Sequence, residues 1–257
     1  MKLLALGDVV GEATLAYLRR NLPNVRRELG ADLVIANGEN VCDIHGISPA
    51  AAQGLLDAGV DLITSGNHIF DRRDGQTFLE NSKSIIRPCN YPAECPGEGS
   101  RMVTSADGWQ ILVVNVSGCV FMEPLGSPYA AVRYELDHAR GRYDFAILDV
   151  HAEATSEKLA IAHYFDGEFA AIFGTHTHVQ TNDAQILPNG TGYITDLGMT
   201  GPVNSILGVR IEDVLTRSRT HLPQRFTVAG GEVRAHGALF EINPTTGKAT
   251  SVKPISF

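Results

Sequence analysis

Asp61-Leu-Ile-Thr-Ser65 is a short apolar run that leads directly into Gly66-Asn67-His68. Because it is bounded by glycines, the run is typical of a buried strand in an α/β protein. Ligands of α/β sheets gather at the carboxyl ends of strands, so Asn67 and His68 lie where a site would form. On its own this signal is weak, because Asn and His are also common turn residues. The rest of the chain is needed to distinguish a functional site from an ordinary turn.

Length and composition predict one globular domain over residues 1–257. Hydrophobic residues make up 44% and charged residues 19% of the chain, as in an ordinary soluble protein. No apolar run reaches the length of a transmembrane helix, so no membrane association is expected. The four cysteines, Cys42, Cys89, Cys95 and Cys119, include no C-x-x-C pair, which argues against a zinc knuckle or a disulfide framework. We therefore expect a cytoplasmic protein.

The formal net charge of −8 bears on the class of partner. It argues against a broad basic surface that would hold duplex nucleic acid through its phosphates. An anionic small-molecule substrate would then need positive charge supplied locally. Bound metal ions are one source, because they are often the largest local charges in a site.

Strand-like and helix-like stretches alternate through the first half of the chain, which is typical of an α/β fold. The patterns predict strands over 2–7, 32–36, 61–65, 101–104, 110–116, 145–148, 169–173, 185–187, 193–195, 233–242 and 248–252. They predict helices over 12–29, 48–56, 129–140, from about 156, and over 211–219. Pro23 is expected to kink or split the first helix, and residues 85–100 to form an irregular connection. An α/β half followed by a β-rich half predicts two mixed sheets between helices, a four-layer αββα sandwich.

Five of the predicted strands end in side chains that can ligate a metal. They are Asp8 after the first strand, Glu39 and Asn40 after the second, Asn67 and His68 after the third, His151 later, and His176 with His178. Each has a structural explanation of its own, such as a turn carboxylate or a hydrogen-bonded histidine. Together they would require several coincidences, because strand ends on one side of a sheet converge in space. The sequence therefore predicts one site of mixed carboxylate, amide and imidazole groups.

The pair His176-x-His178 adds geometry, since in extended chain both imidazoles would point the same way, toward neighbouring metals. Oxygen and nitrogen ligands without thiolate suit Mn, Fe or Zn, and the sequence does not choose among them. Two metals about 3.5 to 4 Å apart, bridged by one carboxylate and a hydroxide, activate water and hold phosphate oxygens. Glu39 is the expected bridge. A phosphodiester also needs its leaving alkoxide protonated, and His68 is the expected general acid.

Six motifs carry a resemblance to a known family. They are Gly7-Asp8-Val-Val-Gly11, Asn37-Gly-Glu-Asn40, Thr64-Ser-Gly-Asn-His68, His151-Ala-Glu-Ala-Thr-Ser-Glu-Lys158, Gly174-Thr-His-Thr-His-Val-Gln180 and Thr195-Asp-Leu-Gly-Met-Thr-Gly-Pro202. In this order, and from end to end of the chain, they resemble the YmdB-like branch of the calcineurin-like metallophosphoesterases.

The resemblance implies an αββα sandwich, a dinuclear centre of iron or manganese, and phosphodiesterase activity on 2′,3′-cyclic nucleotides. It implies that one metal takes Asp8, Glu39, Asn40 and His178, and the other Glu39, Asn67, His151 and His176. His68 carries over as the proton donor. The superfamily usually bridges its metals with an Asp of a G-D-x-x-D motif, and Glu39 takes that place here, as the branch implies. A homo-oligomer is compatible with these features.

Two other functions stay open. The same centre would serve a phosphomonoesterase or nucleotidase, because metal ligands set the class of reaction more firmly than the substrate. A regulatory, RNA-associated protein could also keep the site mainly for binding. Turnover of cyclic esters against monoesters, and the effect of Glu39→Gln on physiological output, would separate the three.

Some motif residues have less certain roles. The 41–46 loop departs from the small, Gly-rich segment usual in the branch, which leaves the substrate preference near Cys42 and His45 open. We interpret His45 as a surface-loop histidine. Lys158 could contact a substrate phosphate, but its segment also predicts a helix start with Thr155 or Ser156 as N-cap, and this is favoured. Arg72-Arg73 is interpreted as a solvated helix face.

Overall fold

Helices and strands follow one another along the chain much as the sequence predicts. The computed structural model describes residues 1–42 and 45–257, so Asp43 and Ile44 of the 41–46 loop lie outside the described residues. The strands are β1 (Lys2–Leu6), β2 (Asp8–Val9), β3 (Leu33–Asn37), β4 (Leu62–Thr64), β5 (Ser100–Thr104), β6 (Gln110–Ser117), β7 (Phe145–His151), β8 (Ala171–Thr175), β9 (Gln185–Ile186), β10 (Gly192–Ile194), β11 (Met199–Pro202), β12 (Val233–Arg234), β13 (His236–Asn243) and β14 (Lys248–Ser256). The helices are α1 (Glu12–Leu29), α2 (Pro49–Asp57), α3 (Arg73–Asn81), α4 (Pro128–Ala139), α5 (Thr155–Tyr164) and α6 (Ile211–Thr220).

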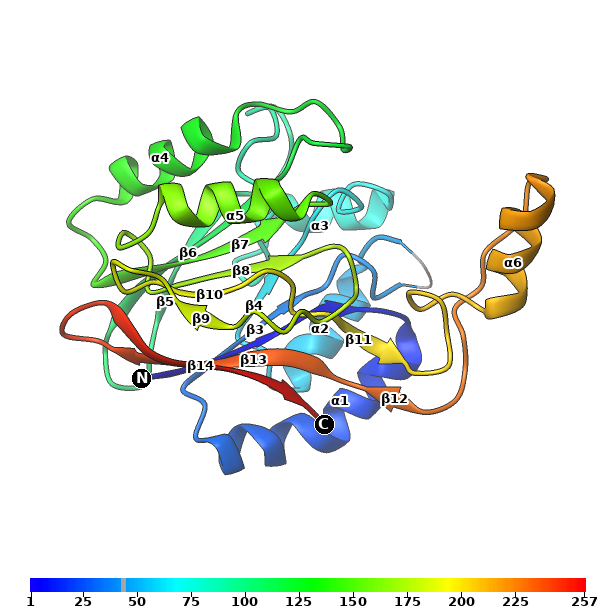
Figure 1. Ribbon diagram of the computed structural model, residues 1–257, viewed down its shortest axis with the longest axis horizontal. Helices are drawn as coiled ribbons and strands as arrows, with labels where there is room; N and C mark the ends of the chain where they lie inside the picture. Colours follow the sequence, from blue (N-terminus) through cyan, green and yellow to red (C-terminus); the bar gives the residue numbers. More distant parts are fainter. Residues whose placement is uncertain (43–44) are drawn as a thin grey trace.

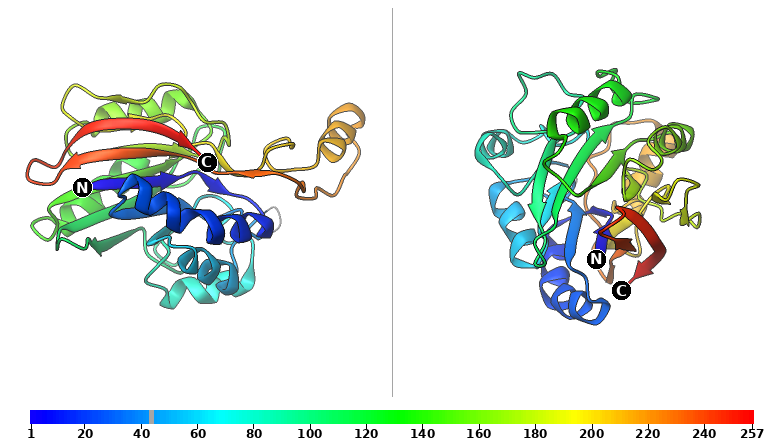
Figure 2. Two further views of the ribbon diagram at one scale, coloured as in Figure 1. Left: turned by 90° about the horizontal axis from the view of Figure 1, so that it is seen from below. Right: turned by 90° about the vertical axis from the view of Figure 1, so that its left-hand side faces the viewer.

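Two large sheets lie face to face, with helices on their outer sides (Figures 1 and 2). The first has five strands in the order β14-β13-β1-β3-β4, and the second has six in the order β5-β6-β7-β8-β10-β9. Both are mixed: β1, β3 and β4 run parallel, as do β6, β7, β8 and β10, whereas the remaining strands of each sheet pair antiparallel. This arrangement confirms the predicted four-layer αββα sandwich.

Strand β1 shows why the layers form. Leu3 and Ala5 are buried in the cluster between the two sheets, whereas Leu4 and Leu6 belong to the cluster that packs the first sheet against α1 and α2. Successive side chains of a strand point to opposite faces, so one apolar strand contributes to two layers. A third cluster packs β6, β7 and β8 against α4 and α5. None of the helices in the described ranges is long and apolar enough to cross a membrane.

Several helix predictions need correction. Pro23 lies inside α1, but the helix runs unbroken, so the chain does not split there. Neither Thr155 nor Ser156 caps α5, whose N-cap is Ala154 without a side-chain hydrogen bond. Helix α3 was predicted only through the interpretation of Arg72-Arg73 as a helix face, without bounds, although its sequence is amphipathic and Leu79 is buried against the core. By contrast, Ser48 caps α2 as its Ser-Pro start predicts.

A third, small sheet with the order β12-β11-β2 was also not predicted. The first strand, predicted over 2–7, ends at Leu6, and the chain then pairs Asp8 with Met199 of β11. After β11 the chain leaves the body of the molecule as an arm, residues 203–232, that carries α6 and returns through β12 (Figures 1 and 2). The small sheet therefore joins Asp8, the first of the predicted ligands, to the base of this arm.

Candidate metal centre

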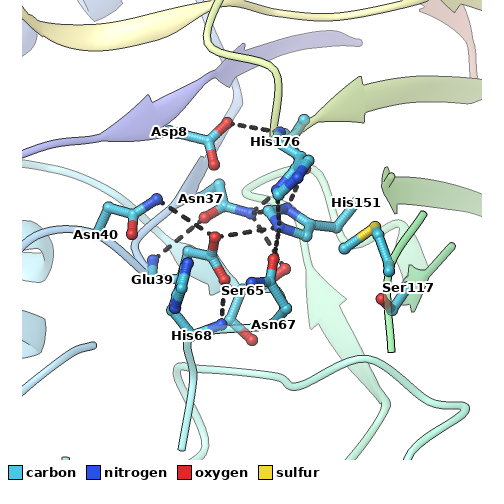
Figure 3. A network of polar contacts seen from close by, with 12 residues as sticks. Asp8, Asn37, Glu39, Asn40, Ser65, Asn67, His68, Ser117, His151 and His176 are labelled. Carbon is cyan, nitrogen blue, oxygen red and sulfur yellow. Dashed lines mark hydrogen bonds and ion pairs between the residues drawn. The ribbon is translucent and has the colours of Figure 1, made fainter. Parts of the chain in front are cut away.

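The predicted site residues from both sheets converge at one end of the sandwich (Figure 3). Asp8 begins β2, Glu39 and Asn40 follow β3, and Asn67 and His68 follow β4. From the second sheet, His151 is the last residue of β7, and His176 and His178 follow β8. The structure thus brings together all eight residues that the sequence singled out.

Glu39 lies at the centre of this group and is fully buried. Its Oε1 atom lies 3.1 Å from Nε2 of His151 and 3.3 Å from Nδ2 of Asn40. Its Oε2 accepts a hydrogen bond of 2.9 Å from the backbone N–H of His68. One carboxylate therefore lies between residues of both sheets, which is the place a bridging ligand has to occupy.

On one side of Glu39, His151 meets two other predicted ligands. Its Nε2 atom lies 3.0 Å from Oδ1 of Asn67 and 3.1 Å from Nδ1 of His176. The other ring nitrogen, Nδ1, lies 2.9 Å from the hydroxyl of Thr175, and that hydroxyl donates to Asp149. Because the hydroxyl proton is used, Nδ1 of His151 carries a hydrogen, which leaves Nε2 as the ring nitrogen that would bind a metal once its own proton is displaced.

On the other side of Glu39, Asp8 and Asn40 face His178. Nε2 of His178 lies 3.6 Å from Oδ1 of Asp8 and 3.4 Å from Nδ2 of Asn40. Oδ1 of Asp8 and Oδ1 of Asn40 are both buried without a hydrogen-bond partner among the residues that the structure describes. Buried acceptors of this kind cost free energy unless something satisfies them, and a cation does so.

The donor atoms fit metal ions. Glu39, His151 and His176 each offer a ligand atom, and these atoms lie within 4.8 Å of one another. With the unpaired oxygens on the other side of Glu39, the set consists of carboxylate, amide and imidazole groups. Such ligands suit Mn, Fe or Zn, as the sequence predicts.

The charged groups of the site shift one another's pKa values. Burial acts to raise the pKa of Asp8, but the neighbouring imidazole of His178, followed by the charge of His151, holds it well below its ordinary range. Burial also opposes ionisation of Glu39, but the neighbouring His151 lowers its pKa. Burial would lower the pKa of His151, yet the charge of Glu39 raises it to about 9. In the metal-free protein, protons on histidines therefore balance the buried carboxylates.

His176 shows the opposite behaviour. Burial, followed by the positive charge of His151, lowers its pKa to about 4. Burial also acts to lower the pKa of His178, but the Asp8 carboxylate 3.6 Å away raises it. The imidazole of His176 is therefore neutral near pH 7, which is the state in which histidine binds a metal.

The segment 176–178 is not extended, contrary to expectation. Both His176 and His178 have positive φ angles, 97° and 61°, so the two rings are placed by a turn rather than by a strand. Thr177 donates from its N–H and its hydroxyl to Asp196. Asp196 in turn pairs at 2.7 Å with Lys158, of which only 1% is exposed. Lys158 thus has a structural role, as favoured, but through this ion pair rather than through a helix cap.

Gly66, the first residue of the motif after β4, permits the approach of His151. A Cβ atom at Gly66 would lie 2.2 Å from the His151 ring, so no other residue fits there without displacing the imidazole. The glycine of Gly66-Asn67-His68 is therefore part of the site, because it lets a ligand from the second sheet reach the first.

His68 lies at the edge of the group rather than inside it. Its Nδ1 atom forms a 2.8 Å contact with Asp71, and its ring stacks on that of His45 with 3.8 Å between ring centroids. His45 is exposed, as expected of a surface-loop histidine, but it also contacts the predicted acid. Cys42 is buried and its sulfur lies 3.3 Å from the Ser48 hydroxyl, away from the ligands named above.

The comparisons with known proteins agree with this geometry. The family model of the YmdB-like proteins matches residues 4–255. The chain belongs to the YmdB-like family. It is 40% identical over 255 residues to the 2′,3′-cyclic-nucleotide 2′-phosphodiesterase of Bacillus subtilis strain 168, and the match covers 99% of this chain and 96% of that protein.

Two solved structures share the fold of this YmdB-like chain. A hypothetical protein from Thermus thermophilus is 41% identical, with a TM-score of 0.94 and coverage of 100% of this chain and 99% of that one. A novel phosphatase from Mycoplasma pneumoniae is 34% identical, with a TM-score of 0.93 and coverage of 100% and 93%. Fold and family are therefore established together.

Sequence reasoning about this YmdB-like chain missed the residues that support the ligands. Asn37 donates to the carbonyl of Ser65, and Asp149 and Thr175 fix the ring of His151. The signal that could have found Asp149 is a carboxylate inside an otherwise apolar strand, since a fully buried charge requires a polar partner.

Proposed function

We propose that this chain is a dinuclear metal-dependent phosphodiesterase that hydrolyses 2′,3′-cyclic nucleotides. The observation that carries the proposal is the fully buried carboxylate of Glu39, which lies 3.1 Å from Nε2 of His151 of the second sheet and 3.3 Å from the side-chain amide of Asn40, which follows β3 of the first. The 40% identity to a 2′,3′-cyclic-nucleotide 2′-phosphodiesterase supports the choice of substrate. Family membership and this relative make the chain a phosphoester hydrolase, as predicted.

Two metal ions, of iron or manganese with zinc as a further candidate, would share Glu39. One would be held by Asp8, Glu39, Asn40 and His178, and the other by Glu39, Asn67, His151 and His176. When bound, such ions activate a water and neutralise charge on the phosphate. The protein's own contribution is to fix the ligands, with Thr175 and Asp149 holding the tautomer of His151.

His68 is the proposed general acid. With Nδ1 engaged by Asp71, its Nε2 atom is the ring nitrogen left to donate a proton to the departing ribose oxygen. Its backbone N–H donates to Glu39, which keeps the residue beside the ligands while its ring borders the adjoining cavity. His68 therefore lies beside the proposed metal ligands without being assigned as one of them.

A substrate panel tests the proposal. Protein of known metal content is assayed with 2′,3′-cyclic AMP, a linear phosphodiester and a phosphomonoester, beside a Glu39→Gln variant as the control for the bridging ligand. We expect the highest kcat/KM for the cyclic nucleotide and its loss in Glu39→Gln. If Glu39→Gln lost its metal but still hydrolysed the cyclic nucleotide as fast as the wild type, the dinuclear mechanism would be contradicted.

A phosphomonoesterase is the second candidate, because the similar protein from Mycoplasma pneumoniae is described as a phosphatase. The same panel separates the two, since a monoesterase would turn over the phosphomonoester at least as well as the cyclic nucleotide. The regulatory, RNA-associated alternative stays a prediction, as do a single domain over 1–257, a homo-oligomer and a cytoplasmic location.

A further inference from the structure

A cavity of about 330 Å³ adjoins the candidate metal centre. One wall consists of site residues, including Glu39, His68 and His176. Apolar residues from the base of the arm also line this cavity. We call them the apolar shelf, and they are Leu207, Val209, Phe226 and Val228. A substrate bound at the metal ligands would therefore also meet an apolar surface.

The apolar shelf is fixed to the body of the molecule. Its two segments pair through the bridge between Val209 and Val228, with a hydrogen bond of 2.8 Å from the N–H of Ala229 to the carbonyl of Gly208. Gly208 has a φ of +94°, and a Cβ atom there would lie 2.6 Å from Val10. Val10 is two residues after Asp8, so the shelf packs directly on the strand that carries a predicted ligand.

The shelf is also tied to a second predicted ligand. The carbonyl of Leu207 lies 3.1 Å from Nδ1 of His178, and Leu207 holds a positive φ of 52°. A branched side chain in this conformation is strained, and such strain persists only where the surroundings enforce it. The Leu207 side chain remains 48% exposed at the cavity.

Phe226 is the aromatic member of the shelf. It is half-buried, and no other ring stacks on it among the residues that the structure describes. Its face is therefore available to a planar group in the cavity. The volume is at the lower end of the range for small-molecule sites, which suits one nucleotide.

We propose that the apolar shelf, with Phe226 at its centre, is the nucleobase subsite, on which the base stacks while the cyclic phosphate lies at the metal ligands. This inference rests on the proposed phosphodiesterase function. Stacking is tolerant of sequence because every base has a π face, and the shelf offers no side-chain hydrogen-bond donor or acceptor. The subsite therefore selects nucleotides over small cyclic phosphodiesters without selecting one base.

The outer edge of the shelf is open. His45, Phe226 and Val228 also border a neighbouring cavity of about 550 Å³. A purine that extends past Phe226 would enter this space rather than meet a closed wall. We expect kcat/KM for purine and pyrimidine cyclic nucleotides to agree within about tenfold, because the shelf itself distinguishes bases only by the strength of stacking.

The test compares Phe226→Ala with the wild type on 2′,3′-cyclic AMP and on glycerol 1,2-cyclic phosphate, which has the five-membered diester but no base. Removing a stacking platform should raise KM for 2′,3′-cyclic AMP about 10- to 100-fold and leave kcat nearly unchanged. Turnover of glycerol 1,2-cyclic phosphate should not change. Phe226→Tyr, which keeps the ring, should behave as the wild type.

Two controls keep the outcomes distinct. Leu222→Ala removes an exposed apolar side chain at the far end of the arm and should leave both substrates unaffected. If Phe226→Ala loses metal, Phe226→Leu replaces it, because this change keeps most of the volume and removes the ring. Equal losses on both substrates, or none on 2′,3′-cyclic AMP, would overturn the subsite.

The wild type separates failure of the subsite from failure of the proposed function. If it hydrolyses neither cyclic ester, the phosphodiesterase proposal fails and the subsite with it. If it hydrolyses both with the same kcat/KM, the phosphodiesterase stands and the nucleobase subsite is refuted. A preference for 2′,3′-cyclic AMP that disappears in Phe226→Ala supports both.

Discussion

At the scale of single residues, Asn67 and His68 are neighbours with different proposed tasks. Asn67→Ala should weaken one metal site, because Asn67 faces His151 at 3.0 Å. His68→Ala should keep both metals and lower kcat by about 10²- to 10⁴-fold, the usual contribution of a general acid. Metal analysis and kcat on the same preparations check this, and equal metal loss in both variants would remove the distinction.

The proton on His151 should make both metal affinity and the stability of the metal-free fold depend on pH. Its pKa is raised to about 9, so near pH 7 the metal-free protein holds a proton that a metal has to displace. Metal affinity should therefore rise by about tenfold per pH unit from pH 6 toward pH 9. The same proton stabilises the metal-free fold below the ordinary histidine pKa of about 6.5, and that stability is lost as pH rises through about 9.

Calorimetric titration of metal-free protein with Mn²⁺ at several pH values measures this proton release. His163→Gln changes an exposed histidine of α5 outside the site and should preserve the slope. A metal affinity that does not change over this pH range would contradict the assignment of His151 as a ligand.

The sequence was sufficient to single out eight residues that the structure brings together, because each lies at or just after the end of a predicted strand with an apolar pattern. It was not sufficient for their supporting partners. Asn37, Asp149 and Thr175 lie inside strands, where no local pattern distinguishes a polar residue that orients a ligand from one that meets a neighbour. Their role depends on distances across two sheets.

At the scale of elements, the turn over 176–178 depends on a buried ion pair. Lys158→Met would leave Asp196 buried without its cation, which costs about 3–5 kcal/mol of unfolding free energy. The free Asp196 would also hold Thr177 less firmly, so metal content should fall. Arg133→Met is the matched control, because the Arg133–Glu168 pair is exposed and such pairs contribute about 0.2–1 kcal/mol.

Chemical denaturation and metal analysis of both variants test this prediction. If Lys158→Met were no less stable than Arg133→Met, the buried pair would not support the turn. The extended chain predicted for His176-x-His178 was wrong for a related reason. Spacing alone does not reveal a positive φ, which here is maintained by Asp8, Asp196 and the carbonyl of Leu207.

The bounds of helix α3 were missed for a different reason. The helix begins at Arg73, after the connection 69–72 that follows Gly66-Asn67-His68, and its N-cap, Arg72, makes no side-chain capping bond. Start signals of the Ser-Pro kind, which located α2, are absent from that segment. The short sheet of β2, β11 and β12 escaped prediction because strands of two to four residues carry no periodicity.

At the scale of the whole molecule, the proposed metals connect the two sheets. Asp8, Glu39, Asn40 and Asn67 come from the side of the first sheet, and His151 and His176 from the second. A ligand that binds only the folded state stabilises it by about 2.7 kcal/mol at a hundredfold excess over Kd. For a chain of this size we expect removal of metal to lower the unfolding midpoint by roughly 5–10 °C.

Thermal unfolding with and without chelator measures this shift of the midpoint. In Glu39→Gln the chelator should shift the midpoint less. A midpoint that is the same with and without chelator would contradict metals that join the sheets. The four-layer architecture itself was predictable, because alternating apolar strands such as β1 determine which faces are covered. The projecting arm was not, because its path depends on the packing of its residue Gly208 against Val10 rather than on local pattern.

The most direct test of the dinuclear phosphodiesterase is turnover of 2′,3′-cyclic AMP by metal-stripped wild type as Mn²⁺ is added back. We predict no hydrolysis without metal, and activity that rises until two ions are bound per chain. Hydrolysis by the stripped protein, or activity complete with one ion bound, would contradict the account.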